Sequence, residues 1–376
     1  MAESETRSNL NTIKDHEEED EETITKTQPL IPGLPNEIAE LCLLRLPYPY
    51  HALFRSVSSS WNKTITNPSF LFSKQSLSII SSPYLFVFAF NKSTAKIQWQ
   101  SLDLASGRWF VLPPMPNSFT KISSPHALSC SSSSRQGKLF ILGGGDANRS
   151  AVVYTALTNR WSFISPMRNP RTYFNAGNVN GKIMAVGGSV DGFGEATTEV
   201  ESYDPETDTW TSVKRVPMVL AKYDSAVIGK EMCVTEGWAW PFMFPPMGQV
   251  YDSDENTWRE MSGGMKEGWT GVSVVIRGRL FVISEHGDFP MKVYFSEDDT
   301  WRYVSGEKLP GDKMRRPFAV TGADDGRVFV VAGGLNVAEG RVSEGENGEF
   351  SVVWRMVSSP QSFVHFSPSS CHVLYV

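Results

Sequence analysis

Short runs of strand-forming apolar residues recur along residues 82 to 376, each about twenty residues ahead of a tryptophan. The runs are LFVF (85 to 88), LFIL (139 to 142), IMAV (183 to 186), MCVT (232 to 235), LFVI (280 to 283) and VFVV (328 to 331). The tryptophans that follow them are Trp109, Trp161, Trp210, Trp258, Trp301 and Trp354. Their spacings of 52, 49, 48, 43 and 53 residues indicate six repeats of one structural unit.

Each repeat is predicted to contain four short antiparallel strands. In four repeats a tyrosine precedes the tryptophan by seven residues, with a turn-rich loop such as DPETD (204 to 208) between them. These tyrosines are Tyr154, Tyr203, Tyr251 and Tyr294, whereas the first and sixth repeats have Leu102 and Asn347 at that position. A four-stranded sheet is too small to bury both of its faces, so we expect the copies to stack radially as a mainly β, six-bladed β-propeller.

The two ends of this repeated region are predicted to meet. The first repeat begins at its second strand, and the C-terminal SSCHVLYV supplies a strand that has no successor in the sequence. We expect this last strand to complete the first blade and to close a ring that spans residues 82 to 376.

Ahead of the repeats, apolar residues in residues 30 to 76 follow a helical spacing. Leu34, Ile38, Leu41 and Leu44 lie three or four positions apart, and a proline at position 35 is typical of a helix start. About forty residues of short helices are below the size at which a single core is normally sufficient. This segment is therefore expected to pack against either the β-propeller or another protein.

The same segment resembles an F-box. The motif positions of the family are present here as Leu34-Pro35, Glu37, Ile38, Leu41, Leu46-Pro47, Val57, Trp61 and Pro68-Ser69-Phe70. The resemblance implies that the segment binds the Skp1-like adaptor, and through it the cullin, of a ubiquitin ligase. The adaptor-binding residues that it implies are Leu34, Pro35, Ile38, Leu41, Leu44, Leu46, Pro47, Val57 and Trp61. The alternative is a helical cap that packs only on its own β domain.

The repeats resemble the kelch motif, whose marks are a double glycine after the second strand and the spaced tyrosine and tryptophan. The double glycines are present in three repeats, at residues 143 to 145, 187 to 188 and 333 to 334. The fourth and fifth repeats depart from this pattern, with Glu236-Gly237 and Ser284-Glu285 at the same place. Over its full length the chain is similar to plant F-box/kelch proteins.

Candidate target-binding residues lie in the connections that follow the second and fourth strands, which emerge at one rim of a propeller. One of these connections contains the aromatic stretch EGWAWPFMFPPMG (236 to 248), whose prolines exclude it from an inner strand. Arginine and aromatic residues are the types that dominate protein interfaces. The candidates are Arg149, Arg171, Trp238, Trp240, Phe242, Trp269, His286, Arg315 and Arg316.

Both groups of candidates have an alternative. The alternative for the aromatic residues is that their side chains fold back and are buried in the propeller. The alternative for the arginines is that they are ordinary exposed loop residues that do not bind an acidic partner.

Charge and composition narrow the class of protein. Residues 1 to 29 contain the acidic run DHEEEDEE and few large apolar residues, which predicts a disordered tail that is either a solubilising segment or a binding arm. The net charge of -6 and the absence of a Lys/Arg run argue against a nucleic-acid partner. The N-terminus lacks the apolar core of a signal peptide, so we expect no membrane partner and a location in the nucleus, the cytoplasm or both.

No catalytic pattern is found in the sequence. The six histidines lack the close spacing of a metal site, and nucleophile-elbow, P-loop and dinucleotide motifs are missing. We therefore expect no cofactor, no metal and no enzymatic activity, although a copper-radical oxidase is an alternative because some kelch-type propellers have that activity.

These observations favour a substrate-recognition subunit of an SCF-type ubiquitin ligase. The helical segment binds the adaptor in this interpretation, and the propeller presents an unidentified target protein. The resemblance to plant F-box/kelch proteins also implies a setting in far-red light signalling under phytochrome. A scaffold that binds the adaptor without causing degradation is the alternative.

Overall fold

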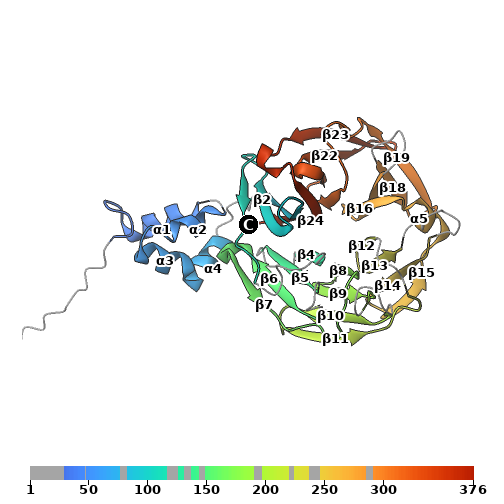
Figure 1. The fold of residues 1–376 in the computed structure, drawn as a ribbon, viewed down its shortest axis with the longest axis horizontal. Helices are drawn as coiled ribbons and strands as arrows, with labels where there is room; N and C mark the ends of the chain where they lie inside the picture. Colours follow the sequence, from blue (N-terminus) through green and yellow to red (C-terminus); the bar gives the residue numbers. More distant parts are fainter. Residues whose placement is uncertain are drawn as a thin grey trace, which may run out of the picture.

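The computed structural model describes residues 29–46, 48–76, 83–116, 126–130, 137–143, 149–189, 197–219, 224–236, 246–284 and 291–376. A small helical segment lies beside a ring of β-sheets (Figure 1). The disordered tail predicted for residues 1 to 29 lies outside the described residues, except for residue 29.

Four short helices form the N-terminal segment: α1 (Asn36–Leu44), α2 (Tyr50–Phe54), α3 (Ser59–Thr66) and α4 (Pro68–Ser76). Local sequence explains where α3 begins, because the side chain of Ser58 accepts a hydrogen bond from the backbone N–H of Trp61. The helices enclose a small core of Leu43, Leu44, Ile65 and Phe70. So few buried residues cannot stabilise the segment alone, and it depends on contacts with the sheets.

The described residues of the β domain form four four-stranded sheets and one eight-stranded sheet. The first sheet has the order β24 (Phe366–Tyr375), β1 (Pro83–Asn91), β2 (Lys96–Asp103) and β3 (Trp109–Val111). The second contains β4 (His126–Cys130), β5 (Lys138–Leu142), β6 (Ala151–Thr155) and β7 (Arg160–Phe163). The third contains β8 (Asn175–Val179), β9 (Lys182–Val186), β10 (Val200–Asp204) and β11 (Thr209–Val213). The fourth contains β12 (Asp224–Ile228), β13 (Glu231–Thr235), β14 (Gly248–Asp252) and β15 (Thr257–Glu260).

The eight-stranded sheet consists of two antiparallel meanders. One contains β16 (Gly271–Ile276), β17 (Arg279–Ser284), β18 (Met291–Phe295) and β19 (Thr300–Gly306). The other contains β20 (Ala319–Gly322), β21 (Arg327–Val331), β22 (Val337–Glu344) and β23 (Phe350–Val357). The meanders join where Ser305 and Gly306 of β19 pair in parallel with Ser351 and Val352 of β23.

The sheets form a propeller-like ring, in which the strands β24, β4, β8, β12, β16 and β20 lie innermost (Figure 1). Each of these inner strands contacts the next one around the ring, including β20 with β24 and β24 with β4. The C-terminal strand β24 pairs antiparallel with β1, so that Leu85 lies opposite Val373. This pairing joins the two ends of the β domain.

The repeated tyrosines and tryptophans are cross-strand partners. In four sheets the two residues lie directly opposite each other on the third and fourth strands, with ring centroids 5.0 to 5.3 Å apart. Each of the four indole N–H groups donates to a backbone carbonyl of the preceding sheet or of the connection after it. These bonds run from Trp161 to Pro113, Trp210 to Ser165, Trp258 to Lys214 and Trp301 to Gly264. The tryptophans therefore hold neighbouring sheets together.

An Asx residue two positions before the tryptophan completes this arrangement. It adopts a left-handed conformation in the same four sheets and accepts a hydrogen bond from the tyrosine hydroxyl. The pairs are Tyr154 with Asn159, Tyr203 with Asp208, Tyr251 with Asn256 and Tyr294 with Asp299. In the sixth repeat the residue opposite Trp354 is Gly340 rather than Asn347, because β22 and β23 are longer than the third and fourth strands of those four sheets. Glycine fits this position, since a Cβ there would approach the indole to 2.6 Å.

The ring has two rims, which are defined by its connections. Antiparallel meanders place the connections between first and second strands and between third and fourth strands at one end, which we call the hairpin rim. The connections that follow the second and fourth strands lie at the other end, which we call the loop rim. Further short helices lie in these connections: η2 (Ala156–Thr158) at the hairpin rim, and α5 (Gly263–Gly268), η3 (Gly333–Leu335) and η4 (Gln361–Phe363) at the loop rim.

Candidate functional site

The helical segment presents an unusual share of the exposed apolar side chains. Five large ones are exposed there, namely Leu34, Ile38, Leu53, Val57 and Phe72, with Leu53 and Phe72 the most exposed at 63% and 69%. Nine others are spread over the much longer described remainder of the chain. Exposed apolar side chains concentrated in so short a segment are typical of a protein-binding surface.

The structure distributes the predicted adaptor-binding residues between surface and core. Leu34, Pro35, Ile38 and Val57 are exposed, and Leu41, Leu46 and Trp61 are half-buried. Pro47 lies outside the described residues. The indole N–H of Trp61 donates to the carbonyl of Leu30 at 2.6 Å, so this side chain also fixes the start of the segment.

Leu44 and Phe72 show where the sequence prediction was wrong and where it was incomplete. Leu44 is 3% exposed and belongs to the small helical core, so it has no surface for a partner. Phe72 was missed, although its helical position indicates exposure. It lies two residues after the buried Phe70, which places it roughly 200° around the helix from the core.

A cluster of tyrosines holds the helical segment against the first two sheets. The hydroxyls of Tyr48 and Tyr154 lie 2.5 Å apart, and the hydroxyl of Tyr84 donates to the backbone carbonyl of Tyr48. All three side chains are buried, and Tyr48 packs edge-on against Tyr84 at 5.1 Å. Burial raises the pKa of Tyr48 and of Tyr154 well above the ordinary range, so both hydroxyls stay protonated and continue to act as donors.

Further contacts place the segment at the hairpin rim. Arg108, between β2 and β3, donates to the hydroxyl of Tyr50 at 2.9 Å. The ring of Tyr50 packs edge-on against Phe110. Arg55 donates to the carbonyl of Thr158, between β6 and β7, at 3.5 Å. The segment therefore contacts its own β domain and still presents an exposed apolar surface.

His51 is a buried polar residue of this junction. Its Nε2–H donates to the carbonyl of Leu43 at 3.0 Å, and its Nδ1 accepts from Lys74 at 3.2 Å. Burial, together with the nearby ammonium of Lys74, lowers the pKa of His51 to about 4. Burial likewise lowers the pKa of Lys74 to about 8. At neutral pH the imidazole is therefore uncharged and the ammonium remains mostly charged.

A basic cleft opens at the loop rim, on the part of the ring that joins the last sheet to the first. It has a volume of about 650 Å³. The charged residues that line it, in the described part of the chain, are Lys92, Lys313, Arg315, Arg316 and one carboxylate, Asp312. We call it the loop-rim cleft. Backbone contacts fix its floor, because the N–H of Gly333 donates to the carbonyl of Arg315 at 2.7 Å and the hydroxyl of Ser359 donates to the carbonyl of Gly334. Arg315 and Arg316 are exposed.

Arg149 is also exposed at the loop rim, where its Nε donates to the carbonyl of Met167 at 2.8 Å. The predicted residues Trp238, Trp240, Phe242 and His286 lie outside the described residues.

The structure removes Arg171 from the predicted target-binding set. Its side chain is completely buried and forms an ion pair with Glu201 at 2.7 Å. It also donates to the carbonyls of Gly187 and Glu199, both at 2.9 Å. A partner cannot reach this guanidinium, whose role is to hold together the connections around the third sheet.

Trp269 is likewise a core residue rather than a contact residue. It is 0% exposed, and its indole N–H donates to Asp224 Oδ2 at 3.0 Å. The backbone N–H of Ser273 donates to the same oxygen at 2.7 Å. Burial raises the pKa of Asp224, while these hydrogen bonds act in the opposite direction.

Other kinds of site were also sought. Within the described ranges, no group of three or more His, Cys, Asp and Glu side chains is arranged to hold a metal ion. None of the helices in the described part of the chain combines the length and apolar character needed to cross a membrane.

Comparison with protein families agrees with the two-part architecture. Residues 31–73 match the F-box domain, and residues 170–217 match the kelch motif. The chain belongs to the F-box/kelch-repeat protein family, whose members are typically adaptors rather than catalysts.

Among individual proteins, the chain is similar to the F-box protein AFR of Arabidopsis thaliana, with 87% identity over 376 residues that span the whole of both chains. The F-box/kelch-repeat protein At1g30090 of the same plant is 37% identical over 353 residues, which cover 93% of this chain and 87% of the relative. A third Arabidopsis relative, At1g22040, is 28% identical over 77% of this chain and 73% of its own length.

Proposed function

We propose that the chain is the substrate-recognition subunit of an SCF-type ubiquitin ligase. Its helical segment binds a Skp1-like adaptor, and through it the cullin, while its propeller binds a target protein for ubiquitination. The observation that carries this proposal is that the chain has two candidate binding surfaces at opposite rims of the propeller. The exposed apolar residues lie on a segment attached at the hairpin rim, and the basic cleft lies at the loop rim.

Adaptor binding is supported by the composition of the helical segment. Leu34, Ile38 and Val57 are exposed despite their apolar character, and they lie within the range that matches the F-box domain. Burying them against a partner would remove apolar surface from water, which contributes roughly 25 cal/mol per Å². Leu53 and Phe72 extend this proposed surface.

The junction supports a positioning role. The buried contacts among Tyr48, Tyr84 and Tyr154 fix the helical segment against the ring. A target held at the loop rim is therefore kept at a set distance and orientation from the adaptor. Such a subunit acts by raising the effective concentration of target lysines near the ubiquitin-carrying enzyme.

As part of this proposal, we count each meander of the eight-stranded sheet as one blade. Both meanders repeat the four-stranded order of the other sheets. Their parallel contact at Ser305 and Gly306 arises at the outermost strands, where β19 extends beyond its hairpin partner β18. The propeller then has six blades.

The loop-rim cleft is the proposed centre of target binding. Four basic side chains face one carboxylate there, which favours an acidic segment of the target. Arg149 and the aromatic residues Trp238, Trp240 and Phe242, together with His286, are proposed to extend this surface along the rim.

The proposal includes no catalytic step, cofactor, nucleic acid or membrane in this chain's own function. It places the protein in the nucleus, the cytoplasm or both. It also places the protein in phytochrome-dependent far-red light signalling, which is supported by the sequence resemblance to plant F-box/kelch proteins.

Affinity capture from plant cells under proteasome inhibition tests the target side. The double variant Arg315→Glu/Arg316→Glu should lose the captured target and retain the adaptor, because reversed charges repel an acidic segment. Arg259→Glu is the control, since Arg259 is an exposed arginine of β15 paired with Glu231. Equal target capture by the double variant and the wild type would refute this use of the cleft.

Deletion of residues 30 to 76 tests whether binding leads to degradation. The proposed receptor role predicts that the captured target becomes more abundant in cells that carry the deletion. An unchanged abundance would instead indicate a scaffold that binds the adaptor without degradation.

A further inference from the structure

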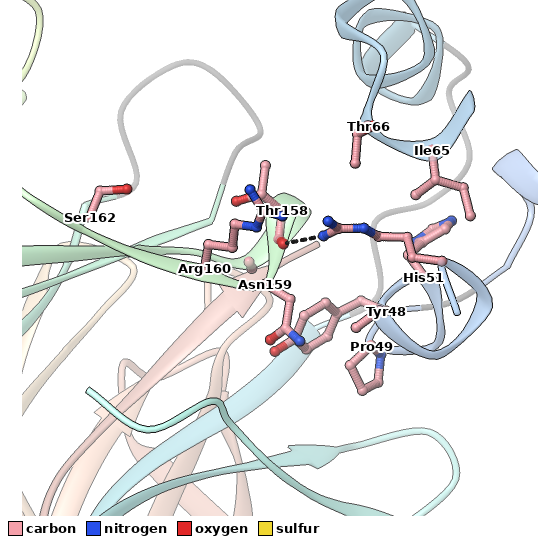
Figure 2. A pocket seen from close by; sticks show the side chains of 12 residues that line it. Tyr48, Pro49, His51, Ile65, Thr66, Thr158, Asn159, Arg160 and Ser162 are labelled. Carbon is pink, nitrogen blue, oxygen red and sulfur yellow. Dashed lines mark hydrogen bonds between the residues drawn. The ribbon is translucent and has the colours of Figure 1, made fainter. Parts of the chain in front are cut away.

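A second cavity lies at the junction between the helical segment and the second sheet (Figure 2). It has a volume of about 280 Å³ and is lined by α2, α3 and the hairpin that joins β6 to β7. Arg55, at the end of α2, donates to the carbonyl of Thr158. The close-up labels Thr158, Asn159 and Arg160 on the side of the second sheet. Residues of both parts of the protein therefore line the cavity.

Its lining, as formed by the residues that the structure describes, is positively charged and contains no carboxylate. Arg55 and Arg160 both contribute to the lining, and the other lining residues are apolar, hydroxyl-bearing or amide side chains and the imidazole of His51. Among the described residues, no ion pair with Asp or Glu involves Arg55 or Arg160. Burial and the positive charge of Arg160 both lower the pKa of Arg55. The two guanidinium groups therefore line the same cavity and repel each other.

The hydrogen bonds within the cavity leave donors unused. Arg55 donates through Nε to Asn62 Oδ1 at 2.9 Å, and its Nη1 makes only a long contact of 3.5 Å with the carbonyl of Thr158. Asn159 accepts from Tyr154 through Oδ1, which leaves its amide N–H groups available. Across the described residues, no hydrogen bond of the Arg160 side chain is found. The available groups are therefore donors, which suit an anionic acceptor.

Comparison among the repeats shows that Arg160 is not required by the fold. The residue directly before the repeated tryptophan is a threonine in the third, fourth and fifth repeats (Thr209, Thr257 and Thr300) and Val353 in the sixth. Only the first two repeats, which contact the helical segment, have arginine there. The guanidinium of Arg108 donates to the hydroxyl of Tyr50, whereas Arg160 lines the cavity.

We propose that the junction cavity binds a small phosphate-class anion, which bridges Arg55 of the helical segment and Arg160 of the β domain. A water molecule occupies about 30 Å³, so the cavity has room for one phosphate group and a few waters. Guanidinium groups form charge-assisted, often bidentate bonds with phosphate oxygens. The bound anion neutralises the two cations and links the two parts of the protein. Occupancy of the cavity thus stiffens the joint between the helical segment and the ring.

Thermal unfolding and calorimetric titration of the full-length chain test this site. The probe is sodium phosphate at constant ionic strength, maintained with sodium chloride. The melting temperature of the wild type should rise with phosphate, because a ligand that binds only the folded state stabilises it. Arg160→Thr and, as a second variant, Arg55→Gln should each weaken phosphate binding by about tenfold or more and remove most of that rise.

The threonine variant has a further expected property. Because three other repeats carry threonine at this position, Arg160→Thr should fold normally. Without phosphate it should be at least as stable as the wild type, since it relieves the repulsion between the two guanidiniums. If Arg160 served only to hold the interface together, Arg160→Thr would instead be less stable than the wild type without phosphate.

Two controls locate the phosphate effect. Arg259→Thr changes an exposed arginine one residue after Trp258 and should leave the phosphate effect intact. Arg315→Gln changes the loop-rim cleft and should also leave it intact. Glycerol phosphate, titrated in parallel, distinguishes a phosphate ester from free phosphate as the preferred form. The proposal is overturned if the wild type shows no phosphate-dependent rise, or if Arg160→Thr retains it.

Discussion

The guanidinium of Arg171 lies 2.7 Å from the carboxylate of Glu201, and both side chains are completely shielded from solvent. The carboxylate also accepts the backbone N–H groups of Arg168 and Asn169 at 2.6 and 2.9 Å. The pair thus fixes the connection that leads from the second sheet to the third. Gly143 lies against the same connection with φ +65°, where a Cβ would approach the carbonyl of Arg171 to 2.8 Å.

Replacing Arg171 by methionine should destabilise the protein by roughly 3–5 kcal/mol, because it leaves the Glu201 carboxylate buried without its counter-ion. Adding Glu201→Gln should recover part of this loss by removing the unpaired charge. Chemical denaturation followed by tryptophan fluorescence measures both effects. Lys230→Met is the control, since Lys230 forms an exposed pair with Asp254 and should change stability little. A loss no larger than that of the control would contradict the assigned role of Arg171.

Removing the hydroxyl of Tyr154 should loosen the helical segment from the ring. In Tyr154→Phe the hydroxyl of Tyr48 loses its 2.5 Å partner, at an expected cost of about 1–2 kcal/mol. Hydrogen exchange of the amides in α2 should accelerate as a result. Tyr203→Phe is a matched control, because Tyr203 occupies the equivalent position in the third sheet and donates to Asp208 without contacting the helical segment. If both variants change exchange in α2 equally, the tyrosine cluster is not what holds the junction.

The buried imidazole of His51 should make stability depend on pH. Its pKa is about 4 in the folded protein, against an ordinary value near 6.5, so the unfolded chain binds more protons between these pH values. The contribution of the neutral imidazole to the free energy of unfolding is fully present above pH 6.5 and is lost as the pH falls toward 4. The free energy of unfolding should fall by at most about 1.4 kcal/mol for each pH unit in this range.

His51→Gln separates this effect from other acid titrations. Glutamine keeps a donor for the carbonyl of Leu43 but does not titrate. Denaturation at a series of pH values should therefore show a smaller loss between pH 6.5 and 4 in the variant than in the wild type. Parallel curves for the two proteins would exclude His51 as the titrating group.

The repeated strands were predictable because a strong local signal fixes them. Tyrosine and tryptophan seven residues apart fall opposite each other when a tight hairpin joins their strands, as Tyr203 and Trp210 do. The signal failed in the sixth repeat, where longer strands place Gly340 opposite Trp354. The Asn or Asp two positions before the tryptophan in four repeats could also have been found in the sequence, since a left-handed turn favours Asn or Asp.

The candidate site was harder to predict, because the sequence indicates the rim on which a residue lies but not the direction of its side chain. Arg171 and Trp269 belong to the loop rim, yet each turns inward to a buried carboxylate, on Glu201 and Asp224 respectively. Those carboxylates lie 30 and 45 residues away in the sequence. Pairing over such distances leaves no local pattern. The junction cavity was missed for the same reason, since Arg55 and Arg160 meet only in the folded chain.

The affinity of the full-length chain for a purified plant Skp1-type adaptor tests the central claim most directly. The wild type should bind in calorimetric titration, and Ile38→Asp and Val57→Asp should each weaken binding by at least about tenfold, because a charge is placed on the proposed apolar contact surface. Val353→Asp, at an exposed apolar position of β23, should bind like the wild type. A wild type that does not bind the adaptor, or F-box variants that bind it as well as the wild type does, would contradict the account.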